Sequence, residues 1–396
     1  MKLITRKEYL NTMINVIGTP EIKIITGVRR SGKSKLLEAF QKYIEENIDN
    51  YNIIYINYSL HETANLMNGE SLYNYVKNNY KKDKVNFVLI DEVQMCQDFE
   101  KAINWLHAEE KYDIYVTGSN AFLLSSDLAT LFTGRTFEIE IYPFSFKEYL
   151  EYTNLKDKDK AFDNYVTEGG LAGSYIYKEI KEKYKYINDV YKTLIFRDII
   201  SKHNLKNEIL IDSLTDFLMD NVSNMTSIRN IANILNTNKM ITNDKIISRY
   251  INYLCNAFMF YKIRRYDIQG KKYLSSQDKY YLVDHSFKFA KLGTKNMNYG
   301  RIYENIVAIE LLRRGYELYV GILYDKEVDF IAVKRNEKLY IQVSDDISND
   351  DTFKREVSPL LKIQDAYPKM IIARTRHDDY QYEGVQIVDI TNWLSE

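Results

Sequence analysis

The eight residues 27–34, GVRRSGKS, constrain the fold of this 396-residue chain more than any other stretch. They match the spacing GxxxxGK[ST] and follow the short β-branched run IKIIT at residues 22–26. Residues 33–48 come next and carry apolar side chains at helical spacing. A strand, a glycine-rich loop and a helix in this order direct backbone N–H groups and the positive helix end at phosphate oxygens. The sequence therefore predicts a phosphate-binding loop for ATP.

Within this loop, the side-chain roles follow from chemistry. The ammonium group of Lys33 is expected to reach the β and γ phosphates, and the Ser34 hydroxyl to bind Mg²⁺. Two arginines make the insert between the glycines unusually basic, and their role is left open. The predicted nucleotide-binding residues are Gly27, Val28, Arg29, Arg30, Ser31, Gly32, Lys33, Ser34 and Lys35.

A second apolar run, NFVLIDE at residues 86–92, ends in two adjacent acids. Strands of a parallel sheet place their carboxyl ends along one edge, where ligands bind. Asp91 is therefore expected to hold Mg²⁺ through water, and Glu92 to act as the general base on the attacking water. The alternative, an acidic surface turn after a buried strand, is less consistent with the loop at 27–34.

Two weaker signals follow. The run YVTGSN at residues 115–120 ends a strand in polar groups, and Asn120 or Ser119 is predicted to align the lytic water. Arg135, in LFTGRTF, is predicted to act as an arginine finger on the nucleotide of a neighbouring subunit, which implies a homo-oligomer. An ordinary capped turn at Gly118 and a surface arginine are the respective alternatives.

Strands and helices alternate through the first 150 residues, which predicts an α/β fold with a parallel sheet. The expected strands cover residues 22–27, 52–59, 86–92 and 113–120, and a fifth begins at residue 136 and runs into a helix. We expect a P-loop ATPase core at residues 1–152. A helical and polar stretch at 153–204 is expected to form a lid over the nucleotide.

Residues 205–290 read as three helices followed by a β-hairpin, the pattern of a winged helix-turn-helix domain. From residue 241 to 290 there are nine basic and four acidic side chains, a balance of +5 against −1 for the chain. Cations interleaved with tyrosines favour contact with the phosphates of double-stranded DNA. A protein-binding winged helix with a solvated hairpin is the alternative.

Residues 291–396 predict a small α/β domain with a nuclease-like outline. Glu304 lies on a helix, Asp329 on a strand, and Gln342–Val343–Ser344 on the next strand. PD-(D/E)xK nucleases have an acid and a lysine at the positions of Gln342 and Ser344, and use the two acids for Mg²⁺. The domain is therefore expected to be inactive and to serve for protein interaction; the alternative is an ATP-dependent nuclease.

The motifs GVRRSGKS, VLIDEVQ, VTGSNAFLLSSDLATLFTGR and IYPFSFKEYL together resemble the AAA-14 family of prokaryotic AAA+-type ATPases, commonly followed by a DUF4143 domain. The resemblance extends over essentially the whole chain. It implies an ATP-binding core of the extended AAA+ class, with an arginine pair inside the loop as here. In EGGLAGS at residues 168–174, this chain has Ala172 where relatives usually have proline.

Composition argues against several classes of site and of cellular location. The two cysteines, Cys96 and Cys255, form no CxxC, and the five histidines show no zinc-site spacing. MKLITRKEYL lacks a signal-peptide core, and no apolar run has membrane-spanning length, so a cytoplasmic protein without membrane contact is expected. The predicted function is an ATPase that couples hydrolysis to motion of the later domains. A slow nucleotide-dependent switch or scaffold with protein partners is the alternative.

Overall fold

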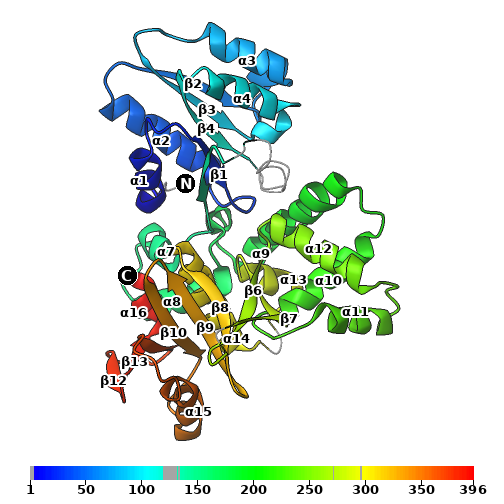
Figure 1. Cartoon of the computed structure of the whole chain (residues 1–396), viewed down its shortest axis with the longest axis vertical. Coiled ribbons are helices and arrows are strands. Elements are labelled where there is room, and N and C mark those ends of the chain that lie inside the picture. The colour runs from blue at the N-terminus through cyan, green and yellow to red at the C-terminus, as the bar shows by residue number, and fades with distance from the viewer. Residues whose placement is uncertain (1–3, 119–131, 133, 271, 295–296) are drawn as a thin grey trace. The chain divides into compact units, whose positions relative to one another are not determined.

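The computed structural model describes residues 4–118, 132, 134–270, 272–294 and 297–396 (Figure 1). The chain forms two compact units. The first comprises Met1–Pro143 with Asn256–Phe258, and the second comprises Phe144–Cys255 with Met259–Glu396. The first unit therefore ends at Pro143, before the boundary predicted for the ATPase core at residue 152, because the following helix packs within the second unit.

The first unit is built on a five-stranded parallel sheet in the order β2-β3-β4-β1-β5. This confirms the predicted α/β class and parallel sheet. All five residues of the strand before the loop are buried, as the continuous apolar run IKIIT predicts. The strands are β1 (Ile22–Thr26), β2 (Tyr51–Asn57), β3 (Val85–Asp91), β4 (Tyr112–Thr117) and β5 (Thr136–Glu140).

Helices cover both faces of this sheet. One core cluster joins α3 (Gly69–Asn78) and α4 (Phe99–Ala108) to one face, and includes Ile24, Ile90 and Val116. A second cluster joins α1 (Lys7–Asn15) and α2 (Lys33–Asn47) to the other face. Short 3₁₀ helices lie at His61–Leu66 and Val93–Met95. Since β1 is buried on both faces, its carboxyl end is held rigidly where the phosphate loop begins.

The second unit contains an eight-stranded mixed sheet in the order β12-β13-β11-β10-β9-β8-β6-β7. The hairpin of β6 and β7 was predicted to be the wing of a separate domain. Instead β6 pairs in parallel with β8, so residue 290 is not a domain boundary in the structure. The strands are β6 (Phe260–Asp267), β7 (Lys272–Leu282), β8 (Glu317–Leu323), β9 (Lys326–Lys334), β10 (Glu337–Ser344), β11 (Lys369–Ala373), β12 (Tyr380–Tyr382) and β13 (Val385–Asp389).

The helices of the second unit include the three predicted before the hairpin. Ser227 caps the second of them by accepting a hydrogen bond from the Asn230 N–H at 3.2 Å. They are α10 (Glu208–Asp220), α11 (Ile228–Thr237) and α12 (Asp244–Asn256). The earlier helical stretch comprises α7 (Phe146–Thr153), α8 (Lys158–Glu168), a 3₁₀ helix (Ala172–Ile176), α9 (Ile180–Thr193) and a π-helix (Leu194–Ser201).

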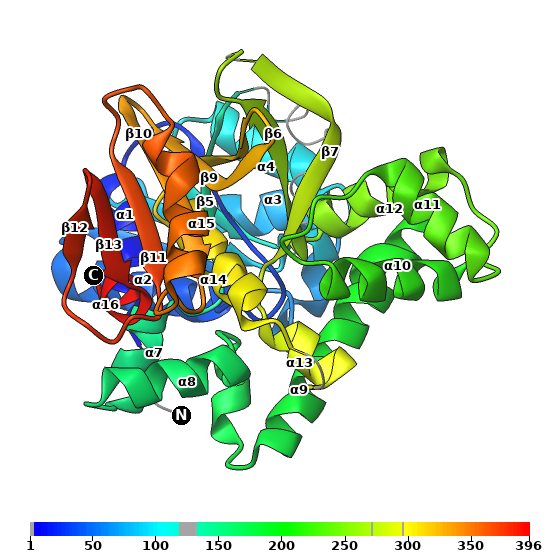
Figure 2. The same cartoon turned by 90° about the horizontal axis from the view of Figure 1, so that it is seen from below.

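Four further helices follow the hairpin. Three of them contact the eight-stranded sheet: α14 contacts four of its strands, α15 contributes Val357 and Leu360 to its core, and α16 contacts β11 and β13 (Figure 2). They are α13 (Ser286–Leu292), α14 (Tyr299–Arg313), α15 (Asp350–Leu361) and α16 (Ile390–Ser395). Within the described part of the chain, no helix combines the length and the apolar character that crossing a membrane requires.

Candidate functional site

The loop at residues 27–34 joins β1 to α2, as predicted, and its two glycines are required by the backbone. Gly27 has φ +133°, and a Cβ there would lie 2.1 Å from the Ile141 carbonyl oxygen. Gly32 precedes the first turn of α2 with φ +102°. Residues other than glycine rarely adopt either of these backbone conformations. The loop can therefore approach a ligand with its backbone, and the N–H groups that begin α2 face the same space.

Lys33 lies on the first turn of α2 and is folded back over the loop. Its side chain is 94% buried, and Nζ donates to the carbonyl oxygens of Gly27 at 2.8 Å and Val28 at 3.0 Å. The Ser31 hydroxyl is also buried and has no hydrogen-bond partner among the described residues. A buried polar atom without a partner is costly unless a ligand satisfies it. The loop thus has the features of an anion site.

The predicted metal ligands lie together, although they come from different elements. Asp91 ends β3, is buried, and is hydrogen-bonded by the side chains of Thr117 and Ser34. Burial raises the pKa of Asp91, and the hydrogen bonds from Thr117 and Ser34 and the charge of Lys33 partly offset that rise. A hydroxyl and a carboxylate in contact supply the hard oxygen ligands that Mg²⁺ prefers. These residues therefore fit the predicted magnesium ion.

Glu92 directly follows Asp91 in a left-handed conformation, with φ +56°. Its backbone N–H donates to the Thr117 hydroxyl oxygen at 3.2 Å. Its carboxylate accepts a hydrogen bond from the Gln94 side-chain amide, whose own oxygen is buried without a partner among the described residues. The predicted base is thus beside the magnesium ligands, and it is held by a neighbouring amide.

Two residues of this site are absent from the predictions. Thr117 ends β4 and contacts both acids, whereas the predicted Asn120 and Ser119 lie outside the described residues. Arg6 is 95% buried and donates to the carbonyl oxygens of Ser31 and Tyr142, at 2.8 Å each. The polar residues that begin at the end of β4 are a sequence signal for a role of Thr117 in the site. A lone arginine 21 residues before the loop gives no signal until the fold is known.

Other predicted residues lie farther from the phosphate space. The Lys35 ammonium pairs with Glu38 on the exposed surface of α2. Arg30 is exposed with φ +67°, and Arg29 is half-buried. The Arg135 carbonyl accepts from the Ile22 N–H at 2.8 Å, at the start of β1. The five residues of β1, roughly 16 Å of strand, separate the start of this strand from the loop.

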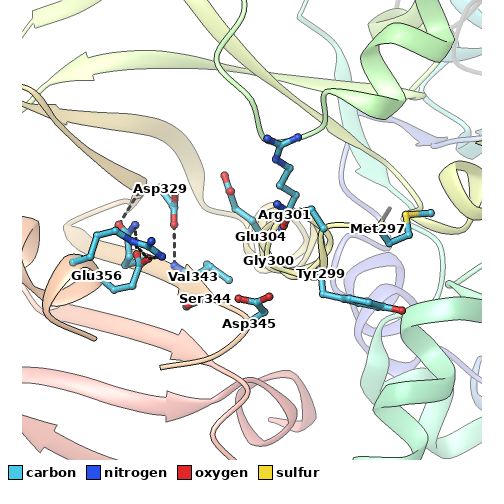
Figure 3. A pocket seen from close by; sticks show the side chains of 13 residues that line it. Met297, Tyr299, Gly300, Arg301, Glu304, Asp329, Val343, Ser344, Asp345 and Glu356 are labelled. Carbon is cyan, nitrogen blue, oxygen red and sulfur yellow. Dashed lines mark hydrogen bonds and ion pairs between the residues drawn. The ribbon is translucent and has the colours of Figure 1, made fainter. Parts of the chain in front are cut away.

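The second unit contains a cavity of about 670 Å³ around the predicted nuclease-like residues (Figure 3). Glu304 reaches it from α14, Asp329 from β9, and Gln342 and Ser344 from β10. The nuclease-like outline predicted from the sequence therefore corresponds to residues that meet in space. Glu356 of α15 lines the same cavity and was not among the predicted residues.

A lysine from β7 forms ion pairs with two of the acids that line this cavity. Nζ of Lys279 lies 2.7 Å from Glu304, 2.5 Å from Glu327 and 3.4 Å from Asp329, and the residue is 98% buried. Lys279 is one of the nine basic side chains counted between residues 241 and 290, and its burial removes it from the basic surface expected there. The sequence shows its charge but not the direction of its side chain.

Further polar groups in and beside the cavity are hydrogen-bonded to one another. The Gln342 amide donates to Glu356 at 2.8 Å, and its oxygen accepts from the Asp329 N–H at 3.3 Å. The Tyr281 hydroxyl donates to Glu304 at 2.6 Å. Burial raises the pKa of both Glu304 and Asp329. No group of three or more acids, histidines or cysteines suited to a metal occurs in the described ranges. These residues do not fit the metal ion of a nuclease.

Comparisons with known proteins match two different domain models to successive parts of the chain. A model of AAA domains, AAA_14, matches residues 19–150. A domain of unknown function, DUF8612, matches residues 159–298, in place of the DUF4143 type expected from the resemblance. Because DUF8612 begins in the predicted lid and ends after the hairpin, it too crosses the boundaries predicted at residues 204 and 290.

Two relatives match over almost the full length. An uncharacterized protein of Methanocaldococcus jannaschii is 26% identical over 98% of this chain and 90% of its own. Among solved structures, the AMPPCP-bound DnaA of Aquifex aeolicus covers 53% of this chain and 67% of its own chain, at 20% identity and with a TM-score of 0.30. An uncharacterized protein of Haemophilus influenzae is 37% identical over 99% of this chain and 98% of its own. The chain therefore belongs to the family of that Haemophilus protein, and it contains an AAA domain of the AAA_14 type.

Proposed function

We propose that the first unit binds ATP with Mg²⁺ at residues 27–34 and hydrolyses it. The observation that carries this proposal is that Asp91, at the end of β3, is hydrogen-bonded by Ser34 and feels the charge of Lys33, both at the start of α2. The glycine conformations, the buried Ser31 hydroxyl and the AAA_14 match support the same ligand.

In this function each group has a separate task. The loop N–H groups and the start of α2 bind the phosphate oxygens, and Lys33 exchanges its carbonyl contacts for the β and γ phosphates. Ser34 and Asp91 would hold Mg²⁺, which supplies charge neutralisation at the β and γ oxygens. Glu92 accepts the proton of the attacking water. Thr117 positions both acids through its hydroxyl.

Two predicted catalytic residues belong to this proposal as well. Asn120 follows Thr117 by three residues and is assigned to alignment of the lytic water. Arg135 lies at the amino-terminal ends of β1 and β5, whereas its own loop follows the carboxyl end of β1, so its proposed role is on the nucleotide of a neighbouring subunit in a homo-oligomer. The second unit is proposed to move in response to the nucleotide state.

A specific contact favours a second candidate, a switch with slow turnover and protein partners. The Gln94 amide engages the Glu92 carboxylate, which must instead accept a proton during hydrolysis. A partner that draws Gln94 away would then trigger hydrolysis. Contact with duplex DNA is the weaker proposal for the second unit, because Lys279 and Lys288 are buried and Lys262 pairs with Asp278 at 2.9 Å.

Glu92→Gln tests the catalytic assignment. ATP binding is expected to persist, while turnover falls by about 10²- to 10⁴-fold, the usual contribution of a general base. Glu70→Gln, on an exposed position of α3, is the matched control and should not change turnover. Unchanged turnover in Glu92→Gln would exclude Glu92 as the base. Faster basal turnover in Gln94→Ala would favour the slow switch over a constantly active ATPase.

A further inference from the structure

A groove of about 490 Å³ lies at the side of the eight-stranded sheet where β6 and β8 separate. The two strands pair only from Arg264 with Tyr319 to Asp267 with Ile322. Before these pairs, the strands diverge, and the groove is lined there by residues 261–263 of β6 and by Glu317 and Leu318 of β8. β6, β7 and β8 can be followed side by side in Figure 1.

Tyrosine rings line one end of this groove. Tyr273 of β7 is 64% exposed, although it is an aromatic side chain. Its ring centroid lies 5.4 Å from that of Tyr266 and 5.3 Å from that of Tyr319, so the three rings hold one another in place. The neighbouring rings fix the orientation of Tyr273 and leave much of its surface open to solvent. An exposed, immobilised ring is a stacking surface for another flat ring.

A cationic group without a carboxylate partner among the described residues lies beside these rings. Arg264 is exposed, lines the groove and has no ion-pair partner in that part of the chain. The other lining cation, Lys262, pairs with Asp278 at 2.9 Å. The lining carboxylate, Glu317, accepts a hydrogen bond from the Tyr319 hydroxyl. Arg264 is therefore the lining cation that is available to an anionic group of a ligand.

We propose that this groove binds single-stranded nucleic acid, with a base stacked on Tyr273 and a backbone phosphate on Arg264. A polyanion with flat rings matches both features, and binding of this kind tolerates any base sequence. A duplex hides its base faces within the helix and cannot use the ring. This proposal is independent of the proposed ATP site, because its residues belong to the second unit.

The test measures fluorescence anisotropy of a fluorescein-labelled oligothymidylate with the full chain, without nucleotide, at two salt concentrations. Binding should weaken as salt rises. Tyr273→Ala should weaken binding by about 5- to 150-fold, the range for loss of one stacked base. Tyr273→Phe keeps the ring and should bind like the parent chain. Arg264→Gln should weaken binding and reduce the salt dependence by about one phosphate contact.

Tyr380→Ala is the matched control, since Tyr380 is 46% exposed on β12 at the opposite edge of the same sheet. It should leave binding unchanged. Equal binding by the parent chain and Tyr273→Ala would overturn the proposal, provided that both unfold at the same temperature. Equal affinity for a duplex of the same length would also overturn it, as would binding of an extended peptide in place of the oligonucleotide.

Discussion

Each of the two units contains a buried lysine near its candidate site, and the two lysines differ in the charge of the oxygen atoms around them. Lys33 of the first unit donates to two neutral carbonyl oxygens of its own loop. Lys279 of the second unit lies within 3.4 Å of three carboxylates. Carbonyl contacts can be exchanged for the oxygens of a phosphate, whereas a lysine among buried carboxylates is committed to the fold. The first arrangement fits a ligand site, and the second fits a structural ion cluster.

Lys33→Met should give the largest change in ligand binding. We expect ATP affinity to fall by roughly 30-fold or more, because removing one partner of a buried charge contact costs about 2–5 kcal/mol. Lys279→Met should leave ATP affinity within about twofold if the two lysines have the separate roles inferred here. Titration calorimetry of both variants with ATP and Mg²⁺ makes the comparison. Equal losses of affinity in the two variants would remove the distinction.

The order of the two variants should reverse when the free energy of unfolding is compared, with the larger loss in Lys279→Met. Lys279→Met leaves the buried carboxylates Glu304 and Asp329 without their cation, which costs about 3–5 kcal/mol. Native-state hydrogen exchange of β7 and β9 resolves this loss within the second unit. Lys262→Met is the control, since its partly exposed pair with Asp278 is expected to contribute about 0–1 kcal/mol. A loss for Lys279→Met no larger than the control would contradict a structural cluster.

The same two regions show how far the sequence leads. The conformation of the loop at 27–34 is determined by local sequence, because the glycine spacing and the following helix fix its backbone. The sequence therefore predicts the parallel sheet and brings Ser34 and Asp91 to one edge. Arg6 and Lys279 act through contacts between segments distant along the chain, and no local pattern distinguishes them from surface cations. The hairpin was misassigned for the same reason, since its pairing partner, β8, follows 35 residues after β7.

Arg6→Gln tests whether this distant contact shapes the ATP site. The change removes the charged donor to the Ser31 and Tyr142 carbonyls, so the loop should lose its fixed conformation. We expect ATP affinity to fall roughly tenfold, because a hydrogen bond to a charged group contributes about 1.5–3 kcal/mol. The maximal turnover rate should change less than the KM for ATP. Lys7→Gln, at the exposed neighbouring position, should change neither; a similar effect in both variants would count against Arg6.

The smallest predicted effect concerns pH. Because burial raises the pKa of Asp91, its carboxylate is protonated at a higher pH than an ordinary aspartate. A protonated acid cannot bind Mg²⁺, so MgATP affinity should rise with pH through this raised pKa and then level off. Thr117→Val removes a hydrogen bond to the carboxylate and should move this rise upward by about one pH unit. A rise near pH 4 that Thr117→Val does not move would contradict the assignment.

Binding of ATP by the purified full chain, measured by calorimetry with and without Mg²⁺, tests the central claim most directly. The account predicts saturable binding to one site in each chain, tightened by Mg²⁺, lost in Lys33→Met and retained in Lys35→Ala, whose ammonium lies on the exposed surface of α2. Absence of ATP binding by the folded chain, or equal binding by the parent chain and Lys33→Met, would contradict it.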